Sequence, residues 1–217
     1  MPETFTRNEL EAGRRLFADG WQFVRGAASV GSLPPPGGIE IALAGRSNVG
    51  KSSLFNALTG RQALARVSNT PGRTQEINFF KGAGELVIAD LPGYGYAEAP
   101  HQKVKAWTAL IHDYLAGRAN LARVFVLVDS RHGLKPADRE FLDLLDRAAV
   151  SYAIVLTKTD HLKPSEETAR AEEMAAAINK RPAAFPTVFP TSAKETSGIE
   201  ALRAAIARLI AERKERG

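Results

Sequence analysis

The stretch that decides the fold is Gly45-Arg46-Ser47-Asn48-Val49-Gly50-Lys51-Ser52, which fits the pattern G-x-x-x-x-G-K-[ST] at every position. A short apolar run, residues 39–44, precedes it, and a helical pattern follows it from Ser53 until Gly60. A strand, a glycine-rich loop and a helix N-terminus are the context in which this pattern binds phosphate. The sequence therefore predicts a phosphate-binding loop.

The residue types in this loop each have a chemical reason. Gly45 and Gly50 let the backbone wrap closely around a phosphate chain, so that consecutive N–H groups point at the anion. Lys51 supplies a positive charge for the β- and γ-phosphates, and the Ser52 hydroxyl is suited to ligate Mg²⁺. We therefore expect nucleotide contacts along the whole loop, at Gly45, Arg46, Ser47, Asn48, Val49, Gly50, Lys51, Ser52 and Ser53.

Composition narrows the class of protein. The 217 residues are 44% apolar and 24% charged, which is typical of a soluble globular chain with a single core. Cysteine is absent, and no apolar run is long enough for a membrane span or a secretory signal, so we expect a cytoplasmic protein with no membrane partner. The net charge of +5 suits an anionic partner such as RNA, and it equally suits a merely basic surface.

The order of predicted elements indicates the architecture. Residues 1–38 are expected to form an N-terminal extension packed on the core, with one helix, a short edge strand at 21–24 and a proline-rich connector. In residues 39–217, the main domain, strands alternate with helices, and residues 76–81 and 85–90 are expected to form a hairpin. This pattern predicts an α/β fold of three layers: a mostly parallel central sheet with helices on both faces and ligands at the carboxyl ends of the strands.

A second motif indicates which base the bound nucleotide carries. Thr157-Lys158-Thr159-Asp160 follows a predicted strand, and an aspartate carboxylate accepts two parallel hydrogen bonds from the N1–H and the 2-amino group of guanine. Adenine would leave that carboxylate unpaired, which disfavours an ATP-dependent kinase. Lys158 is expected to lie along the base plane, and a backbone N–H of the last loop is expected to reach guanine O6. The base-binding residues are then Thr157, Lys158, Thr159, Asp160, Thr191, Ser192, Ala193 and Lys194.

Two further loops are expected to contact the γ-phosphate and the metal ion bound to it. Asp90, at the end of a predicted strand, is expected to hold Mg²⁺ through a water, and the Gly93 N–H is expected to contact the γ-phosphate. A threonine of the polar loop at 68–75 can complete the metal shell when a γ-phosphate is present, and both Thr70 and Thr74 are candidates. Asp90, Leu91, Pro92 and Gly93 are expected to contact the nucleotide.

The set GRSNVGKSS, PGRTQ, DLPGYGYA, TKTD and TSAK resembles the five signature motifs of the EngB (YsxC/YihA) family of bacterial ribosome-assembly GTPases, over nearly the whole chain. The resemblance implies a P-loop GTPase G domain that binds GTP and GDP. It implies Thr74 as the switch threonine, with Gly72 and Arg73 beside the nucleotide, so that Mg²⁺ is held by Ser52, Thr74 and Asp90 and hydrolysis depends on Lys51, Thr74 and Gly93. It also implies a role in assembly of the large ribosomal subunit or its precursor, historically tied to septation and cell division.

Three positions bear on the rate of hydrolysis. Thr157 stands where asparagine is usual in Ras-like GTPases, so a hydroxyl can replace one hydrogen bond to the base or to the phosphate loop. Tyr94 stands where a glutamine usually orients the attacking water, so we expect slow intrinsic hydrolysis. By similarity to potassium-dependent GTPases, Asn48 is a candidate to hold K⁺ near the phosphates; it is equally a candidate for a hydrogen bonder that shapes the loop.

Three functions compete. The favoured one is a GTPase switch, taken to be a monomer, that docks on a pre-ribosomal particle. A GTPase of another pathway, in RNA modification or metal transport, is the nearest rival, although those usually carry additional domains. The third is a non-catalytic binding protein that uses GTP only to fix its shape.

Overall fold

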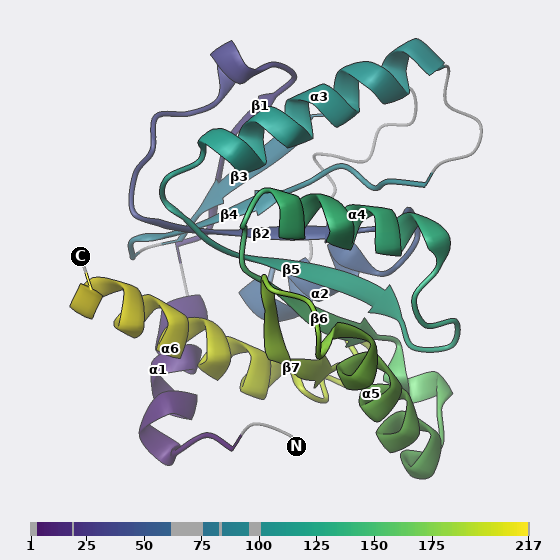
Figure 1. Ribbon diagram of the computed structural model, residues 1–217. Helices are drawn as coiled ribbons and strands as arrows, with labels where there is room; N and C mark the ends of the chain where they lie inside the picture. The colour runs from purple at the N-terminus through teal and green to yellow at the C-terminus, as the bar shows by residue number, and fades with distance from the viewer. Residues whose placement is uncertain (1–3, 19, 62–75, 83, 96–100, 217) are drawn as a thin grey trace.

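A computed structural model describes residues 4–18, 20–61, 76–82, 84–95 and 101–216, and the side chains of 101–107 and 216 lie outside this description (Figure 1). The strands are β1 (Gln22–Ala27), β2 (Ile39–Gly45), β3 (Ile77–Lys81), β4 (Leu86–Asp90), β5 (Leu121–Asp129), β6 (Tyr152–Thr157) and β7 (Ala184–Pro190). The helices are α1 (Arg7–Phe17), α2 (Lys51–Thr59), α3 (His101–Gly117), α4 (Pro136–Arg147), α5 (Pro164–Ile178) and α6 (Ile199–Arg216), with short 3₁₀ turns η1 (Val30–Ser32) and η3 (Thr159–His161).

One seven-stranded sheet, in the order β1-β3-β4-β2-β5-β6-β7, runs through the molecule. The strands β4, β2, β5, β6 and β7 are parallel, because helical crossovers connect them. β3 and β4 pair antiparallel, which confirms the predicted hairpin, although Ala83 in its turn lies outside the described residues. The predicted α/β fold, with a mostly parallel sheet, is confirmed.

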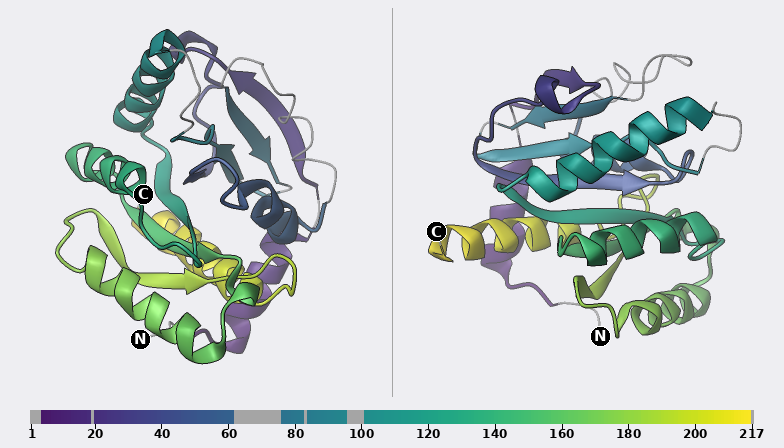
Figure 2. Two further views of the ribbon diagram at one scale, coloured as in Figure 1. Left: turned by 90° about the vertical axis from the view of Figure 1, so that its right-hand side faces the viewer. Right: turned by 45° about the horizontal axis from the view of Figure 1, so that its top comes forward.

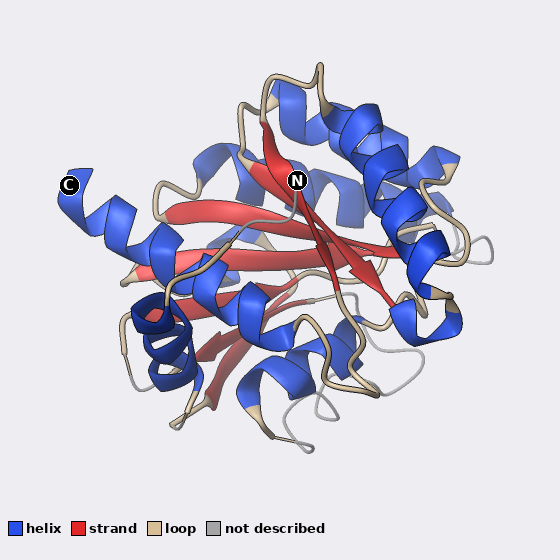
Figure 3. Ribbon diagram, turned by 90° about the horizontal axis from the view of Figure 1, so that it is seen from below, coloured by secondary structure: helices blue, strands red, loops and turns tan. Residues whose placement is uncertain are grey.

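Helices cover both faces of the sheet (Figures 2 and 3). Buried side chains of α3, α4 and α5 pack on one face in one apolar cluster, and those of α1, α2 and α6 pack on the other in a second cluster. The apolar residues at helical spacing on α6 are all buried: Ile199, Leu202, Ile206, Leu209 and Ile210. The two clusters fix the sheet from both sides and so hold the carboxyl ends of its strands in place.

One helix start differs from the sequence pattern, which predicts Ser165 as the cap of the helix after β6. α5 begins instead at Pro164, with Lys163 as its N-cap. The Lys163 N–H donates to the Glu166 carboxylate at 2.8 Å. Proline suits the first helical position because its fixed φ matches the helix and its missing N–H would have no partner there.

The N-terminal residues join the rest of the chain at two places. β1 pairs antiparallel with β3 and forms one edge of the sheet, as the pattern predicts. α1 crosses α6 at Gly13, where the backbones come so close that a Cβ added to Gly13 would lie 2.6 Å from the Ala204 N. Arg208 of α6 donates to the Glu9 carboxylate at 2.7 Å, and this bond lowers the pKa of Glu9 to about 2. The boundary at residue 38 stays a prediction.

Replacing Gly13 with alanine tests this helix crossing. In an ordinary helix interior, replacing glycine with alanine raises the free energy of unfolding by about 0.5–1 kcal/mol, because glycine loses more backbone entropy than alanine on folding. Here the added methyl must displace backbone, so we expect G13A to lower the free energy of unfolding by about 1–3 kcal/mol in urea denaturation. The matched control is G117A at the end of α3, where a Cβ would have no neighbour within 4 Å. A G13A protein as stable as G117A would contradict the close crossing.

Candidate functional site

Four loops that carry the predicted motifs leave the sheet at the same edge. The phosphate loop follows β2, Asp90 ends β4, Thr157 ends β6, and Thr191 follows β7. These four strands are parallel, so their carboxyl ends lie together. The topology thus gathers residues that are more than a hundred positions apart in the sequence.

The phosphate loop has the backbone shape that its glycines permit. Gly50 has φ of 103°, in the left-handed region, and α2 begins directly after it. Asn48 also has a positive φ, 64°, which asparagine tolerates better than most residues. The segment after β4 lies against this loop: the Ser47 N–H donates to the Tyr94 carbonyl at 3.2 Å, and a Cβ on Gly93 would lie 3.1 Å from the Ser47 N.

Lys51 and Asp90 meet at the start of α2. The Lys51 ammonium donates to Asp90 Oδ1, and both side chains are largely buried. The cation expected for the phosphates and the carboxylate expected for the metal are therefore neighbours. Leu91 directly after Asp90 is buried, and its N–H donates to the Leu43 carbonyl of β2 at 2.9 Å, which fixes the exit of β4.

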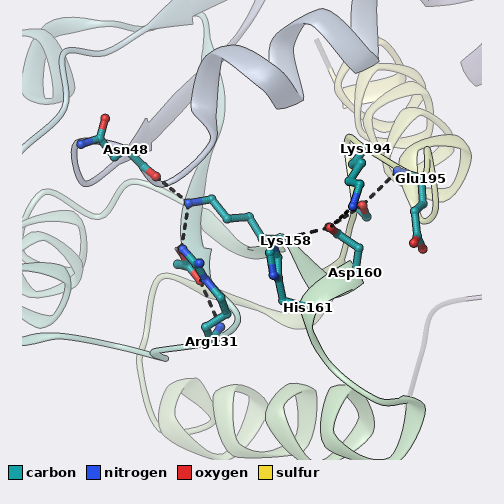
Figure 4. A network of polar contacts seen from close by, with 9 residues as sticks. Asn48, Arg131, Lys158, Asp160, His161, Lys194 and Glu195 are labelled. Carbon is teal, nitrogen blue, oxygen red and sulfur yellow. Dashed lines mark hydrogen bonds and ion pairs between the residues drawn. The ribbon is translucent and has the colours of Figure 1, made fainter.

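The end of β6 is bonded to the phosphate loop through two carbonyls. The Thr157 hydroxyl donates to the Val49 carbonyl at 2.6 Å, so the threonine that replaces the usual asparagine contacts the phosphate loop. Lys158, with φ of 60°, extends its ammonium to the Asn48 carbonyl at 2.7 Å (Figure 4). The base loop and the phosphate loop are thus one connected unit.

Asp129, at the end of β5, anchors that lysine. Its carboxylate lies 3.0 Å from the Lys158 ammonium and accepts two bonds from the Arg131 guanidinium at 2.9 and 2.7 Å. Burial alone would raise the pKa of Asp129, but the hydrogen bonds from Arg131 and Lys158 outweigh it and hold the pKa well below its ordinary value. The carboxylate is therefore ionised, and it holds Lys158 electrostatically at neutral pH.

Asp160 is oriented by the loop after β7. The Ser192 hydroxyl donates to Asp160 Oδ1 at 2.7 Å, and the Lys194 ammonium lies 3.9 Å from Oδ2 (Figure 4). The bond from Ser192 lowers the pKa of Asp160 below its ordinary value, against the effect of burial. The Thr159 N–H donates to the Thr191 carbonyl at 3.2 Å, which keeps the two loops side by side. An ionised carboxylate fixed in this way can accept the paired N–H groups of guanine.

A cavity of about 170 Å³ lies between these loops and α2. Its walls include Gly50 and Ser53 from the phosphate loop and start of α2, and Ala193 from the loop after β7. His161 also lines it, with Nε2 3.7 Å from Asp160 Oδ2; this histidine is exposed, as the sequence indicates for a surface or loop residue, and its position at the cavity is the part that sequence reasoning missed. Its place directly after Asp160 is the signal that could have identified it.

Tyr94 is packed into the protein. Only 6% of it is exposed, its ring stacks on Phe141 of α4 with centroids 4.8 Å apart, and its hydroxyl donates to Asp138 Oδ1 at 3.0 Å. Burial and the nearby carboxylate raise the pKa of Tyr94 well above its ordinary value. The phenol is thus a neutral hydrogen-bond donor that joins the segment after β4 to α4.

The structure brings together the phosphate loop, Asp90 to Gly93, Thr157 to Asp160 and Thr191 to Lys194 at one edge of the sheet. The side chain of Arg46 does not line the base cavity; it lies in a second cavity on the other side of Lys158. The predictions for Gly72, Arg73 and Thr74 and for the rival Thr70 fall outside the described residues, as does Tyr96 of the DLPGYGYA motif. Among the described helices, none combines the length and apolar character needed to cross a bilayer.

Comparisons with known proteins agree with this geometry. A family model described as "50S ribosome-binding GTPase" matches residues 40–158. A relative from Bradyrhizobium diazoefficiens, named "Probable GTP-binding protein EngB", is 60% identical over 94% of this chain and 95% of its own length. A relative of the same name from Rhodopseudomonas palustris strain TIE-1 is 56% identical over 99% of this chain and all of its own length.

The solved structures include a crystal structure of a "probable GTP-binding protein engB", which is 28% identical, covers 80% of this chain and 99% of its own, and has a TM-score of 0.62. The translation elongation factor SelB from Methanococcus maripaludis shares the fold, at 20% identity and a TM-score of 0.57; the match covers 79% of this chain and 33% of the SelB chain. The extent of the match to the family model and to these relatives shows that the chain belongs to the EngB family of GTP-binding proteins, within the ribosome-binding GTPases.

Proposed function

We propose that this protein is a GTP-hydrolysing switch that acts in assembly of the large ribosomal subunit and thereby supports normal septation and cell division. The observation that carries the proposal is the single cavity bordered by the phosphate loop and by Asp160 with its Ser192 bond. The ribosomal part is supported by the description of the matching family model and by the EngB relatives. In this proposal the protein is a cytoplasmic monomer whose GTP form docks on the large subunit or its precursor.

The proposed role of each residue follows from its position at the carboxyl ends of the parallel strands. Residues 45–53 surround the phosphates, with the backbone N–H groups around Gly50 and the start of α2 as donors, because the Ser47 N–H is already bonded to the Tyr94 carbonyl. Lys51 contacts the β- and γ-phosphates, and the Gly93 N–H contacts the γ-phosphate. The guanine lies on the stem of Lys158 and bonds Asp160, while the loop of Thr191 to Lys194 contributes a backbone N–H to O6. Gly72, Arg73 and Thr74, which lie outside the described residues, are proposed as further nucleotide contacts.

Magnesium fits the oxygen donors that the proposal assigns to it. The Ser52 hydroxyl and the Asp90 carboxylate lie at this edge, and the proposed third ligand, the Thr74 hydroxyl, belongs to a residue outside the described part of the chain; a hard cation prefers such oxygen ligands. Asp90 lies beside the Lys51 ammonium, so the metal and the lysine would share the negative charge of the same phosphates. When bound, the ion would neutralise charge on the phosphate oxygens. The protein's part is to orient these oxygens and to hold the nucleotide with its N–H groups.

The variant D160N tests the guanine assignment. An amide in place of the carboxylate loses one of the two accepted bonds, so we expect GTP affinity to fall about a hundredfold. The amide N–H₂ can instead donate to the O2 of xanthine, so xanthosine triphosphate should bind D160N more tightly than GTP does. D143N, on the exposed side of α4, is the matched control and should bind like the unchanged protein. Equal GTP affinity for D160N and D143N in calorimetric titration would refute the assignment.

Slow intrinsic hydrolysis is part of the proposal. Tyr94 is buried and stacked on Phe141, and its hydroxyl donates its one proton to Asp138, so the side chain is directed into α4 and is not placed to orient an attacking water molecule. The same observation favours a second candidate function, a nucleotide-dependent binding module without turnover. Multiple-turnover measurements with and without large ribosomal subunits separate the two, because a switch is stimulated by its partner and a binding module is not.

Potassium near Asn48 is a proposed source of stimulation. The positive φ of Asn48 also fits the alternative, in which this residue only shapes the loop. The variant N48G distinguishes them, because glycine keeps the backbone conformation and removes the amide oxygen. We expect the unchanged protein to hydrolyse GTP faster in K⁺ than in Na⁺ at equal ionic strength, and N48G to lose this difference. Equal rates in the two salts for the unchanged protein would exclude the potassium role.

Co-sedimentation with separated ribosomal subunits tests the ribosomal role. The protein is loaded with a non-hydrolysable GTP analogue or with GDP and is mixed with large or small subunits. We expect it to sediment with the large subunit in the analogue state only. If the protein sediments with neither subunit in either state but still binds guanine nucleotide tightly, the ribosomal role is wrong and the assignment as a guanine-nucleotide-binding protein is unaffected.

A further inference from the structure

A second cavity of about 240 Å³ lies beside the phosphate loop and is separate from the base cavity. Arg46, Ser47 and Asn48 form one wall, and Asp129, Arg131 and His132 form another. Lys158 lines both cavities and so stands between them (Figure 4). Neither Lys51 nor Asp90 lines this second cavity, so it is not the space proposed for the β- and γ-phosphates.

The acidic groups of this cavity are already bonded. Asp129 accepts bonds from Arg131 and is paired with Lys158. Asp138, at the base of the cavity, accepts the Tyr94 hydroxyl at 3.0 Å and the Lys135 N–H at 2.9 Å. The Asp138 carboxylate also lies within electrostatic reach of the Arg46 guanidinium. Three cations, Arg46, Arg131 and Lys158, and two carboxylates, Asp129 and Asp138, line the cavity, so its charged side chains leave a net positive charge that attracts anions.

Arg131 and Lys158 are both held by direct bonds, and Arg46 is the least constrained of the three cations. Within the part of the chain that the structure describes, the Arg46 side chain makes no hydrogen bond and no ion pair, although it is half-buried. A guanidinium presents N–H groups in a planar fork that matches two oxygens of a phosphate or a carboxylate. A half-buried guanidinium without such a partner, in a cavity that opens to solvent, is suited to bind an external anion.

The same side chain lies beside the segment that follows Gly93. A Cβ on Gly95 would be 3.6 Å from Arg46 Nε, and the backbones of Arg46 and Tyr94 are bridged as in a parallel sheet. In the proposed function this segment starts the loop that responds to the γ-phosphate. An anion on Arg46 would thus touch the protein at a place whose position depends on the nucleotide.

We propose that this second cavity binds a phosphodiester group of RNA, with Arg46 as its main contact and Arg131 and His132 at its rim. The inference rests on the proposed function, since it names the chemistry by which the GTP form contacts a ribosomal particle. RNA is favoured over a protein carboxylate because the space exceeds one carboxylate, because Arg131 and His132 at the rim are exposed, and because the whole chain carries a net charge of +5.

Salt-dependent binding of four variants tests the proposal. The unchanged protein, R46Q, R46K, H132E and H112E are each loaded with a non-hydrolysable GTP analogue and compared at equal nucleotide occupancy. Affinity is measured over a range of potassium concentrations, first for large ribosomal subunits and then for protein-free ribosomal RNA extracted from them. H112E makes the same chemical change as H132E on the exposed side of α3, away from the cavity.

We expect R46Q to bind both probes about tenfold more weakly than the unchanged protein. The slope of log affinity against log salt concentration should be shallower by about 1 for R46Q, as expected when one phosphate contact is lost. R46K keeps the charge but not the fork, so it should retain the slope and lose part of the affinity. H132E places a negative charge at the rim and should weaken binding several-fold, whereas H112E should bind like the unchanged protein.

Three other outcomes would each contradict a specific claim of this proposal. If the unchanged protein binds large subunits in the analogue state and R46Q matches it in affinity and slope, the inference fails and the proposed function stands. If R46Q weakens binding to intact subunits but not to protein-free RNA, the cavity takes a protein carboxylate and the RNA assignment is wrong. If the unchanged protein binds neither probe, both the inference and the ribosomal role fail.

Discussion

The candidate site depends on the bonds between the end of β6 and the outer side of the phosphate loop. The Thr157 hydroxyl holds the Val49 carbonyl, and these two residues are 108 positions apart. In a trans peptide the carbonyl of one residue points opposite to the N–H of the next. A carbonyl of Val49 held on the outside therefore directs the N–H of Gly50 inward, where a phosphate would lie. The strand end that we propose to select guanine thus also sets the geometry of the proposed phosphate-binding loop.

Lys158 extends this connection sideways. Its ammonium bonds the Asn48 carbonyl and pairs with Asp129, which in turn holds Arg131. The result is one row of charged side chains from the base cavity to the second cavity, with Lys158 in both walls. A group bound on either side acts on the same lysine. This shared element gives a physical route by which the nucleotide and a docked partner can affect each other, because both would bias one side-chain arrangement.

Much of the fold and of the candidate site follows from local sequence. The phosphate loop is recognisable because its glycines and lysine have fixed spacing, and the strands are recognisable because parallel strands are continuous apolar runs. What local sequence does not give is pairing at long range. Glu40 interrupts the apolar run of β2, yet it is fully buried, because Arg118 and the Tyr114 hydroxyl bond its carboxylate. Partners 74 and 78 positions away cannot be read from a pattern.

The same limit applies to Tyr94 and Gly13. The motif identifies Tyr94 as a replacement for a water-orienting residue, but its burial depends on Asp138 and Phe141 of a helix far along the chain. Gly13 lies in a helical pattern in which a glycine is merely unfavourable. Only the crossing with α6 explains why glycine is needed at position 13, because a side chain there would collide with the backbone at Ala204.

The affinity of the variant T157V for GDP, measured by calorimetry, tests most directly whether the two loops act as one site. Valine has nearly the shape of threonine but cannot donate to the Val49 carbonyl, and an unmade bond of this kind costs about 1–3 kcal/mol. The account predicts that T157V binds GDP roughly tenfold to a hundredfold more weakly. T168V, which loses a similar bond to the Pro164 carbonyl on the exposed side of α5, should bind GDP normally. A T157V protein that binds GDP as tightly as T168V would contradict the account.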